Sequence, residues 1–189
     1  MNSFEEQRRS MIKENEGSIA HMYLDTAGKV TVAVGQMLAT AAAAEGLTFN
    51  RRDNGNRATA AEIGQDYESV ARQTLGRPAS FYKQFTKLDM PEDAIDELLD
   101  KRIDEFESDL RGDFPEYDSY PDTAKLGLMD MVFNLGHAGL ISKFPTFTQA
   151  ARAQDWRTCA KECRRRGISD ARNDMTKQLF EDAATAAGQ

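Results

Sequence analysis

The chain has 189 residues, of which 40% are hydrophobic and 29% charged, a composition that suits one soluble globular domain with a sizeable core. Its net charge of −7 disfavours a role in binding nucleic acid, because a phosphate backbone attracts basic surfaces. No apolar run approaches the ~18 residues that a membrane-spanning helix needs, and the charged first residues do not resemble a secretory signal. We therefore expect a monomer that neither inserts into a membrane nor binds nucleic acid.

The N-terminal part predicts a helix followed by a β-hairpin. Residues 3–6, Ser-Phe-Glu-Glu, match a capping box, and Gly17 is a natural helix end. Residues 20–36 then carry β-branched and apolar residues on either side of a turn at Ala27-Gly28. A helix that ends beside a hairpin is therefore the first structural expectation.

The stretch 39–88 has the least regular pattern. Residues 41–45 favour a helix, and 50–56 form a polar segment that predicts a loop. Residues 59–75 show a helical period, which Arg77-Pro78 interrupts.

The second half predicts a helical region. A helix start at residue 89 begins a long helix that extends to 110. The dipeptides Phe114-Pro115 and Tyr120-Pro121 then bound a linker. Residues 123–135 are apolar nearly all round, as in the buried centre of a helical domain, except for Asp130 and Asn134. Gly136 ends this helix, and three further helices are expected at 145–152, at 155–166 with Asp155 as its cap, and at 170–186 with Ser169 as its cap.

The cysteines and histidines predict no metal site. Cys159 and Cys163 lie four residues apart on a predicted helix, a spacing that rarely suits a disulfide, and we expect both to be packed as small apolar residues. His21 and His137 lack the spacing of metal ligands. No cofactor is expected.

Three side chains have the types that glycosidic-bond hydrolysis requires. Glu16 ends the first helix, where the helix dipole disfavours a negative charge and so favours the protonated form of a general acid. Asp25 stands at the hairpin turn and Thr31 on the returning strand, where a carboxylate and a hydroxyl can hold a water molecule. Taken singly, each has an ordinary role: a solvated helix end, a turn cap and a β-former.

Three stretches of the chain resemble the phage-type lysozymes, the endolysins of T-even phages and their relatives. These stretches are Glu16-Gly17 with Tyr23-Leu24-Asp25-Thr26-x-Gly28 and Thr31-Val32-x-Val34-Gly35; Met131-Val132-Phe133-Asn134-Leu135-Gly136; and the segment from Asp155-Trp156 through Arg165–Asn173 to Leu179-Phe180. The likeness covers about residues 1–38 and 89–186, and it is greatest to lysozyme-like domains of bacteriocins and antibacterial effectors.

The resemblance implies an α+β, mostly helical, lysozyme-like fold in a single domain, 1–189. A small lobe, 1–88, would carry the hairpin, 89–110 would be the connecting helix, and 111–189 would form a larger helical lobe. A cleft is expected between the lobes, and the carboxyl groups of Glu16 and Asp25 should face the same groove.

The resemblance also implies an activity: hydrolysis of the β-1,4 bond between N-acetylmuramic acid and N-acetylglucosamine in peptidoglycan. Glu16 would be the general acid, and Asp25 and Thr31 would position and activate the attacking water, with inversion. Met37 and Phe133 match positions that line the sugar-binding cleft, and Asn134 is expected to reach it.

Two features depart from the family pattern. The family commonly pairs a histidine after the last hairpin glycine with an aspartate on the long helix; here these positions are Gln36 and Arg102, for which we expect a hydrogen bond. The stretch 39–88 is longer than in the phage enzymes, and we expect it to add helices beside the cleft, where it could set substrate choice or bind an inhibitor protein.

Two other functions remain open from the sequence. A lytic transglycosylase on the same fold works with one glutamate and lets a sugar hydroxyl attack, whereas the presence of Asp25 and Thr31 favours water. A non-catalytic module that binds cell wall or inhibitor is the third interpretation. For an enzyme, the glycan strands are the expected partner, reached through holin-type lysis or a secretion system, with an immunity protein in a producer of an effector.

Overall fold

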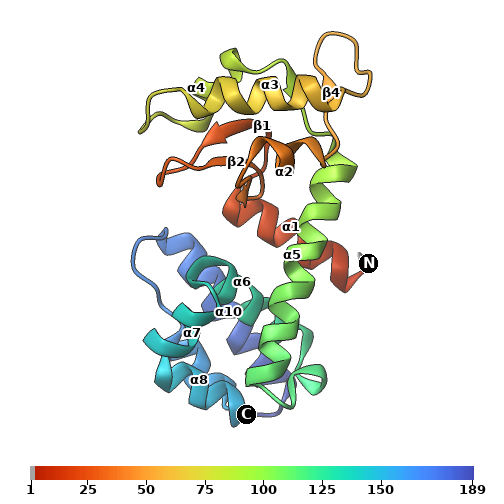
Figure 1. The fold of residues 1–189 in the computed structure, drawn as a ribbon. Coiled ribbons are helices and arrows are strands. Elements are labelled where there is room, and N and C mark those ends of the chain that lie inside the picture. Colours follow the sequence, from red (N-terminus) through yellow and green to blue (C-terminus); the bar gives the residue numbers. More distant parts are fainter. Residues whose placement is uncertain (1–2) are drawn as a thin grey trace. The chain divides into compact units, whose positions relative to one another are not determined.

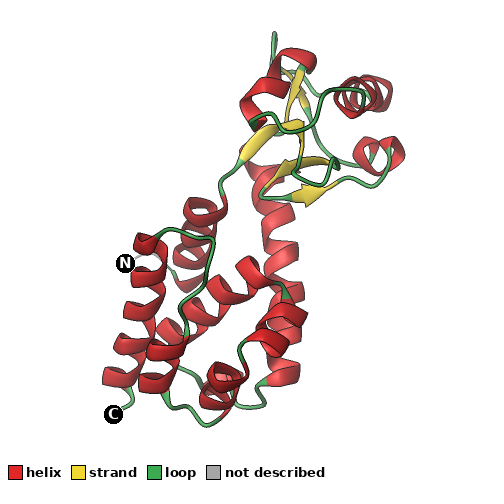
Figure 2. Cartoon of the chain, turned by 90° about the vertical axis from the view of Figure 1, so that its left-hand side faces the viewer, coloured by secondary structure: helices red, strands yellow, loops and turns green. Residues whose placement is uncertain are grey.

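The computed structural model describes residues 3–189, whose elements are labelled in Figure 1. The chain divides into two compact units. Residues 16–100 form one of them, called here the hairpin unit, and the chain up to Asn15 together with 101–189 forms the other, called the helical unit. The described chain is mostly helical, and its strands all belong to the hairpin unit (Figure 2). This confirms the expected α+β class with a predominance of helix.

The first helix, α1, spans Phe4–Glu16 and begins with the predicted capping box. The Ser3 backbone N–H donates to the Glu6 carboxylate at 3.0 Å, and the Glu6 backbone N–H donates to Ser3 Oγ at 3.3 Å. Gly17 follows with φ +78°, a left-handed conformation that turns the chain out of the helix.

The hairpin is a three-stranded antiparallel sheet in the order β1-β2-β3, formed by Ile19–Leu24, Val30–Ala33 and Gln36–Met37. The turn after β1 has the expected glycine in the left-handed region, since Gly28 has φ +77°. The register between β1 and β2 shifts between Ile19 and Tyr23, a β-bulge. The predicted hairpin is confirmed, with β2 as its central strand.

The stretch after the hairpin holds short elements. These are α2 (Ala41–Glu45), β4 (Asn50–Arg51), α3 (Ala60–Ala71), α4 (Ala79–Tyr82), a 3-10 helix (Lys83–Phe85) and β5 (Leu88–Asp89). The predicted helix at 41–45 is confirmed, and α3 is shorter than the predicted 59–75. The prediction of a loop throughout 50–56 was wrong at its start, because β4 pairs antiparallel with β5. A two-residue strand paired with a distant segment leaves no periodic signal in the sequence.

The hairpin unit has its own apolar core, formed where α3 and α4 pack on β1 (Figure 1). Each fully buried Val, Leu, Ile or Phe side chain in such a core contributes about 1.5–3 kcal/mol relative to exposure. The buried members are Met22, Leu24, Val30, Val32, Ala33, Leu38, Ala44, Phe49, Ala58, Ile63, Val70, Tyr82, Leu88, Met90 and Ile95. The inserted stretch therefore supplies about half of the core on which the hairpin rests.

The long helix α5 spans Glu92–Asp113, and the boundary between the two units falls within it. After a 3-10 helix at Tyr117–Ser119, the helical unit continues with α6 (Asp122–Leu135), α7 (His137–Lys143), α8 (Pro145–Arg152), α9 (Trp156–Glu162) and α10 (Asp170–Ala186). The predictions for α6, α8 and α10 are confirmed, whereas α9 ends earlier than predicted. The helix α7 was missed, because Gly136, with φ +69°, ends one helix and directly precedes another.

The helical unit is built around α6, whose residues from Leu126 to Val132 are all buried. Aromatic rings fill the space between its helices: Trp156 meets Tyr120 edge-on at 4.8 Å, and Phe147 meets Phe180 at 5.3 Å between ring centroids. Both cysteines are free and buried, as expected, and burial raises the pKa of the Cys163 thiol to about 11. These thiols act as apolar packing groups.

Asp130, the polar exception in the middle of α6, is fully buried and receives two cations from outside its helix. Its Oδ2 lies 2.5 Å from Arg165 Nη2, and its Oδ1 lies 2.8 Å from Arg172 Nη2. Thr176 Oγ1 donates to Oδ2 at 2.6 Å, and Asn15 Nδ2 donates to Oδ1 at 2.9 Å. One carboxylate thus ties α6 to α10 and to the end of α1.

A second ion pair sets the start of α3. The capping box of this helix joins Thr59 to Glu62. Arg51 of β4 donates two hydrogen bonds to the Glu62 carboxylate, from Nε at 2.7 Å and from Nη2 at 2.8 Å. Hydrogen bonds from Arg51 and from Thr59 lower the pKa of Glu62 to about 2. The pair joins the short ribbon of β4 and β5 to α3.

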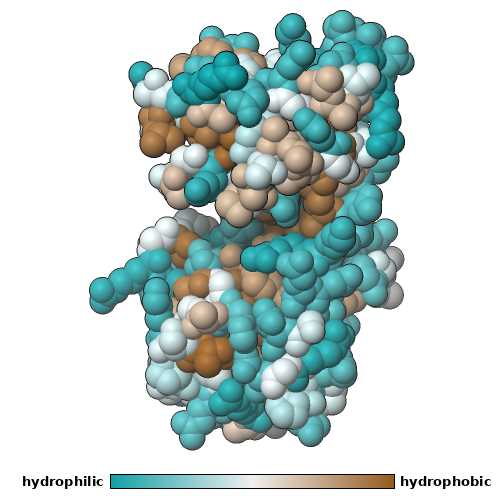
Figure 3. Space-filling view, in the orientation of Figure 1, coloured by the Kyte–Doolittle hydropathy of each residue, from teal (hydrophilic) through white to brown (hydrophobic). Residues whose placement is uncertain are grey.

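Hydrophilic residues cover most of the face drawn in Figure 3 in each unit. Among residues 3–189, the large hydrophobic side chains that remain exposed are Met37, at 48%, and Leu75, at 57%. In the same range, no helix combines the length and the apolar character needed to cross a lipid bilayer.

Substitution Asp130→Asn is expected to destabilise the protein by about 3–5 kcal/mol, because it leaves two arginines without their buried counter-charge. Urea unfolding followed by circular dichroism measures this change. The matched control is Glu105→Gln, which breaks an exposed pair with Arg102 and should cost no more than about 1 kcal/mol. Equal effects of the two substitutions would contradict a central role for the buried carboxylate.

Substitution Glu62→Gln is expected to flatten the acid dependence of stability. The folded-state pKa of Glu62 lies below its ordinary value of 4.5, so the contribution of this carboxylate is complete above about pH 4.5 and is lost as the pH falls towards 2. The wild-type chain should thus lose more unfolding free energy between pH 5 and pH 2 than the variant. Parallel stability curves for both proteins in urea melts across this range would contradict the assignment.

Candidate active site

Asp25 lies half-buried at the end of β1, and its two carboxylate oxygens have different surroundings. Oδ1 accepts hydrogen bonds from the backbone N–H groups of Ala27 at 2.9 Å and Lys29 at 2.8 Å. No hydrogen bond or ion pair to Oδ2 is found within residues 3–189. Asp25 therefore caps the turn with one oxygen and keeps the other available.

Thr31 lies on the central strand β2 and is 2% exposed. Its hydroxyl donates to the carbonyl of Lys29 at 3.1 Å, the residue whose N–H binds Asp25. Because the hydroxyl proton is taken, Oγ1 can only accept a further hydrogen bond, for example from a water molecule. Lys29 thus links the backbone positions of the two predicted catalytic side chains.

The register of the sheet places further side chains beside Thr31. Its direct partners are Tyr23 on β1 and Met37 on β3, and directly paired residues share a face of the sheet. Burial, and after it the negative charge of Asp25, raises the pKa of the Tyr23 phenol. One face of the hairpin therefore carries the phenol, the hydroxyl and the thioether side by side, with Asp25 at its end.

Glu16 is the last residue of α1, is exposed and belongs to the same unit as Asp25 and Thr31. The residue before it is held firmly, because the carbonyl of Asn15 accepts a hydrogen bond from Arg172 Nη1 at 3.2 Å. Asn15 also donates its side-chain amide to the buried carboxylate of Asp130. Asn15, which directly precedes Glu16, is thus bound to the ion network of the helical unit.

The three predicted substrate-binding residues are divided between the units. Met37 is exposed beside Thr31 on the hairpin. Phe133 and Asn134 are half-buried in the last turn of α6, and the Phe133 ring packs edge-on against Phe106 at 5.0 Å. Within the hairpin unit, the structure thus places Met37 beside Thr31.

Gln36 and Arg102, for which a hydrogen bond was expected, each make local contacts within their own unit. The Gln36 side chain donates to the carbonyl of Met37 at 3.2 Å. Arg102 binds Glu105 at 2.9 Å and stacks over the ring of Phe106 at 4.2 Å, so each of the two residues is engaged within its own segment. The two residues belong to different units, so the bond between them stays a prediction.

Leu75, which the sequence did not mark, lies on the turn of the hairpin. A Cβ placed on Gly28 would come within 2.9 Å of Leu75 Cδ2, so the leucine side chain sits directly over this glycine. Leu75 belongs to the loop after α3, which Tyr82 holds through a hydrogen bond to the carbonyl of Thr74 at 2.9 Å. The inserted stretch therefore reaches the turn that carries Asp25.

The histidines are bound within the fold. His21 Nε2 lies 2.9 Å from the carbonyl of Ala79, and His137 pairs with Asp113. Within residues 3–189, no three His, Cys, Asp or Glu side chains are grouped closely enough to hold a metal ion. The described chemistry of the candidate site thus consists of carboxyl, hydroxyl and phenol groups.

No family model matches this chain, and no curated protein is significantly similar to it in sequence. The candidate site is therefore defined by its geometry alone. Glu16 offers an exposed carboxyl at the end of a helix, and on the hairpin that follows, Asp25 has one hydrogen-bonded and one open oxygen, with the hydroxyl of Thr31 on the next strand.

Asp25→Asn is expected to keep the turn, because the amide oxygen can accept the same two N–H groups, whereas Asp25→Ala removes both bonds. A lost hydrogen bond costs about 0.5–1.5 kcal/mol. Amide hydrogen exchange at Lys29 should therefore stay close to wild type in the asparagine variant and accelerate in the alanine variant. Equal acceleration in both would show that the cap depends on the negative charge.

Proposed function

We propose that this chain is a peptidoglycan hydrolase that cleaves the β-1,4 bond between N-acetylmuramic acid and N-acetylglucosamine. In this proposal Glu16 donates a proton to the leaving glycosidic oxygen, and Asp25 and Thr31 hold the attacking water. The observation that carries the proposal is that one oxygen of the Asp25 carboxylate is held by two backbone N–H groups while the other is left open.

A general base for water needs a carboxylate oxygen that the protein leaves open and a backbone that keeps it in place. Asp25 has both, because Oδ1 is fixed by two N–H groups while Oδ2 has no partner among residues 3–189. Thr31 can only accept a hydrogen bond from this water, because its hydroxyl already donates to the backbone carbonyl of Lys29. A water donating one proton to each of the two groups would have its lone pair directed away from them.

The position of Glu16 in the chain supports its proposed role as the proton donor. It follows directly on a residue tied to Arg172 and Asp130, and two residues separate it from the start of β1. The short link to β1, within the unit that also holds Asp25 and Thr31, keeps the backbone of Glu16 close to the hairpin, and catalysis depends on holding the reacting groups in one arrangement. Tyr23 and Met37 offer a partly apolar surface next to Thr31, suited to the faces of sugar rings.

The proposed enzyme uses no cofactor and acts on the cell wall of a bacterium. Delivery through a holin-type lesion fits an endolysin, and injection by a secretion machine fits an antibacterial effector whose producer carries an immunity protein. Attack by water from the side opposite the leaving group gives inversion at the anomeric carbon, which proton NMR of the fresh product can detect.

Glu16→Gln is expected to lower the rate of wall lysis by about 10²–10⁴-fold, the usual contribution of a general acid, without changing the unfolding transition. Turbidity of a cell-wall suspension and release of reducing ends measure the rate. Glu14→Gln, at an exposed position of the same helix, is the matched control and should retain wild-type activity. Wild-type lysis by purified Glu16→Gln protein would refute the role of Glu16.

Mass spectrometry of the released muropeptides separates the enzyme classes. Hydrolysis leaves reducing ends and incorporates oxygen from ¹⁸O-labelled water, whereas a transglycosylase leaves 1,6-anhydro ends. Anhydro products would overturn hydrolysis while preserving a role for Glu16. Binding to peptidoglycan with no turnover at any pH would instead favour a non-catalytic wall-binding module.

A further inference from the structure

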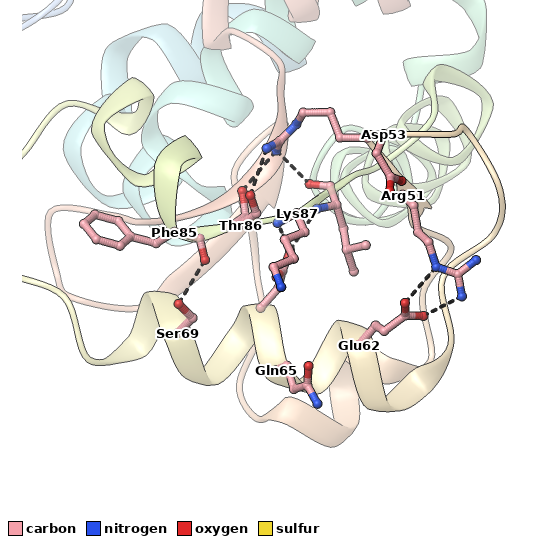
Figure 4. A pocket seen from close by; sticks show the side chains of 11 residues that line it. Arg51, Asp53, Glu62, Gln65, Ser69, Phe85, Thr86 and Lys87 are labelled. Carbon is pink, nitrogen blue, oxygen red and sulfur yellow. Dashed lines mark hydrogen bonds and ion pairs between the residues drawn. The ribbon is translucent and has the colours of Figure 1, made fainter.

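The hairpin unit contains a cavity that the proposed catalysis does not use. It has a volume of about 660 Å³, within the range of small-molecule sites, and lies between α3 and the ribbon of β4 and β5. All of its lining residues fall within 51–88, so Glu16, Asp25 and Thr31 are not among them. Figure 4 shows Arg51 and Glu62 at one end, Phe85 and Ser69 at the other, and Lys87 between them.

The cavity contains a buried carboxylate with an unused oxygen. Asp66, on α3, is 6% exposed, and its Oδ2 accepts the backbone N–H groups of Lys87 at 2.8 Å and Leu88 at 3.0 Å. Within residues 3–189, Oδ1 has no hydrogen-bond or ion-pair partner. Because Asp66 lines the cavity, a ligand there can offer this oxygen a hydrogen-bond donor.

Cationic groups of the cavity differ in how far the protein already engages them. Arg52 is occupied by Asp89 and by the carbonyls of Thr86 and Leu88. Arg51 uses Nε and Nη2 on Glu62, as described above, which leaves Nη1 as a spare donor. The ammonium group of Lys87 has no hydrogen-bond or ion-pair partner within residues 3–189, although its charge attracts the Asp66 carboxylate.

The unengaged groups select a ligand that carries both signs of charge. An anion such as phosphate would satisfy Lys87 but would be repelled by Asp66. A metal cation would meet the carboxylate together with three positive side chains, those of Arg51, Arg52 and Lys87. An apolar molecule would leave the acid without a donor. A molecule with an ammonium group and a carboxylate satisfies both sides at once.

We propose that this cavity binds a small zwitterion of the amino-acid class, with its ammonium group on Asp66 Oδ1 and its carboxylate on Lys87 and Arg51 Nη1. The remaining wall offers both polar and apolar groups, among them the half-buried ring of Phe85, to the body of the ligand.

The physiological ligand follows from the proposed function, on which this step rests. The stem peptides of peptidoglycan end in residues with a free carboxylate, and a diamino acid in them carries an ammonium group as well. The cavity would then hold a stem peptide while the hairpin acts on the glycan. Such a contact would distinguish walls by their peptide chemistry.

The test is a titration of the full chain, carrying Glu16→Gln so that no turnover interferes, with the tripeptide L-alanyl-γ-D-glutamyl-meso-diaminopimelate. We expect saturable binding, with ¹⁵N–¹H shifts concentrated at the amides of Lys87 and Leu88. Lys87→Met and Asp66→Asn should each weaken binding at least tenfold, while Lys101→Met, at an exposed lysine that does not line the cavity, should leave it unchanged. If Asp66→Asn does not fold, Lys87→Met decides.

Three results would overturn the proposal: no shifts at millimolar tripeptide, equal binding of a tripeptide with acetylated amines and amidated carboxyls, or the same shifts with chitotriose in place of the peptide. The outcome is independent of catalysis. Peptide binding without any wall lysis by the wild-type chain would retain the cavity and remove the hydrolase, and lysis without peptide binding would do the reverse.

Discussion

The buried carboxylate of Asp130 is the constraint on which the helical unit depends. Two guanidinium groups converge on it in a place that water does not reach, so neither the acid nor the two bases can be removed without leaving a charge in a medium that opposes it. Its partners come from α10, from the segment before α10 that holds Arg165, and from the end of α1. The packing of three helices and the position of the residue before Glu16 are therefore set by a single interaction.

The hairpin shows how a structural and a chemical role can share one side chain. Asp25 caps a turn, which is the ordinary task of an aspartate there, and the cap holds the carboxylate so that its other oxygen has a defined direction. Thr31 is a β-former on a central strand, and its hydroxyl is oriented by the carbonyl of Lys29. The ordinary interpretation of each residue supplies the rigidity that the proposed chemistry requires.

The stretch 39–88 is an integral part of the hairpin unit. It contributes α3 and α4 as a cover for the sheet, it places Leu75 over the turn beside Asp25, and it forms a cavity lined by the carboxyl group of Asp66. The Arg51–Glu62 pair and the capping box at Thr59 hold its ribbon to its helix. A segment that supports one site and encloses a second is well placed to decide which substrates the unit accepts.

Local patterns in the sequence determined the elements whose signals are local. Capping residues predicted the starts of α1, α9 and α10, glycines predicted the ends of α1 and α6, and the turn at Ala27-Gly28 predicted the hairpin with Asp25 and Thr31 on it. Tertiary structure alone decided the rest. The pairing of β4 with β5, the partners of Asp130 and the place of Leu75 join residues far apart along the chain, and a polar or exposed side chain carries no mark of the distant group that satisfies it. Such choices follow from burial and charge pairing, which exist only once the chain has folded.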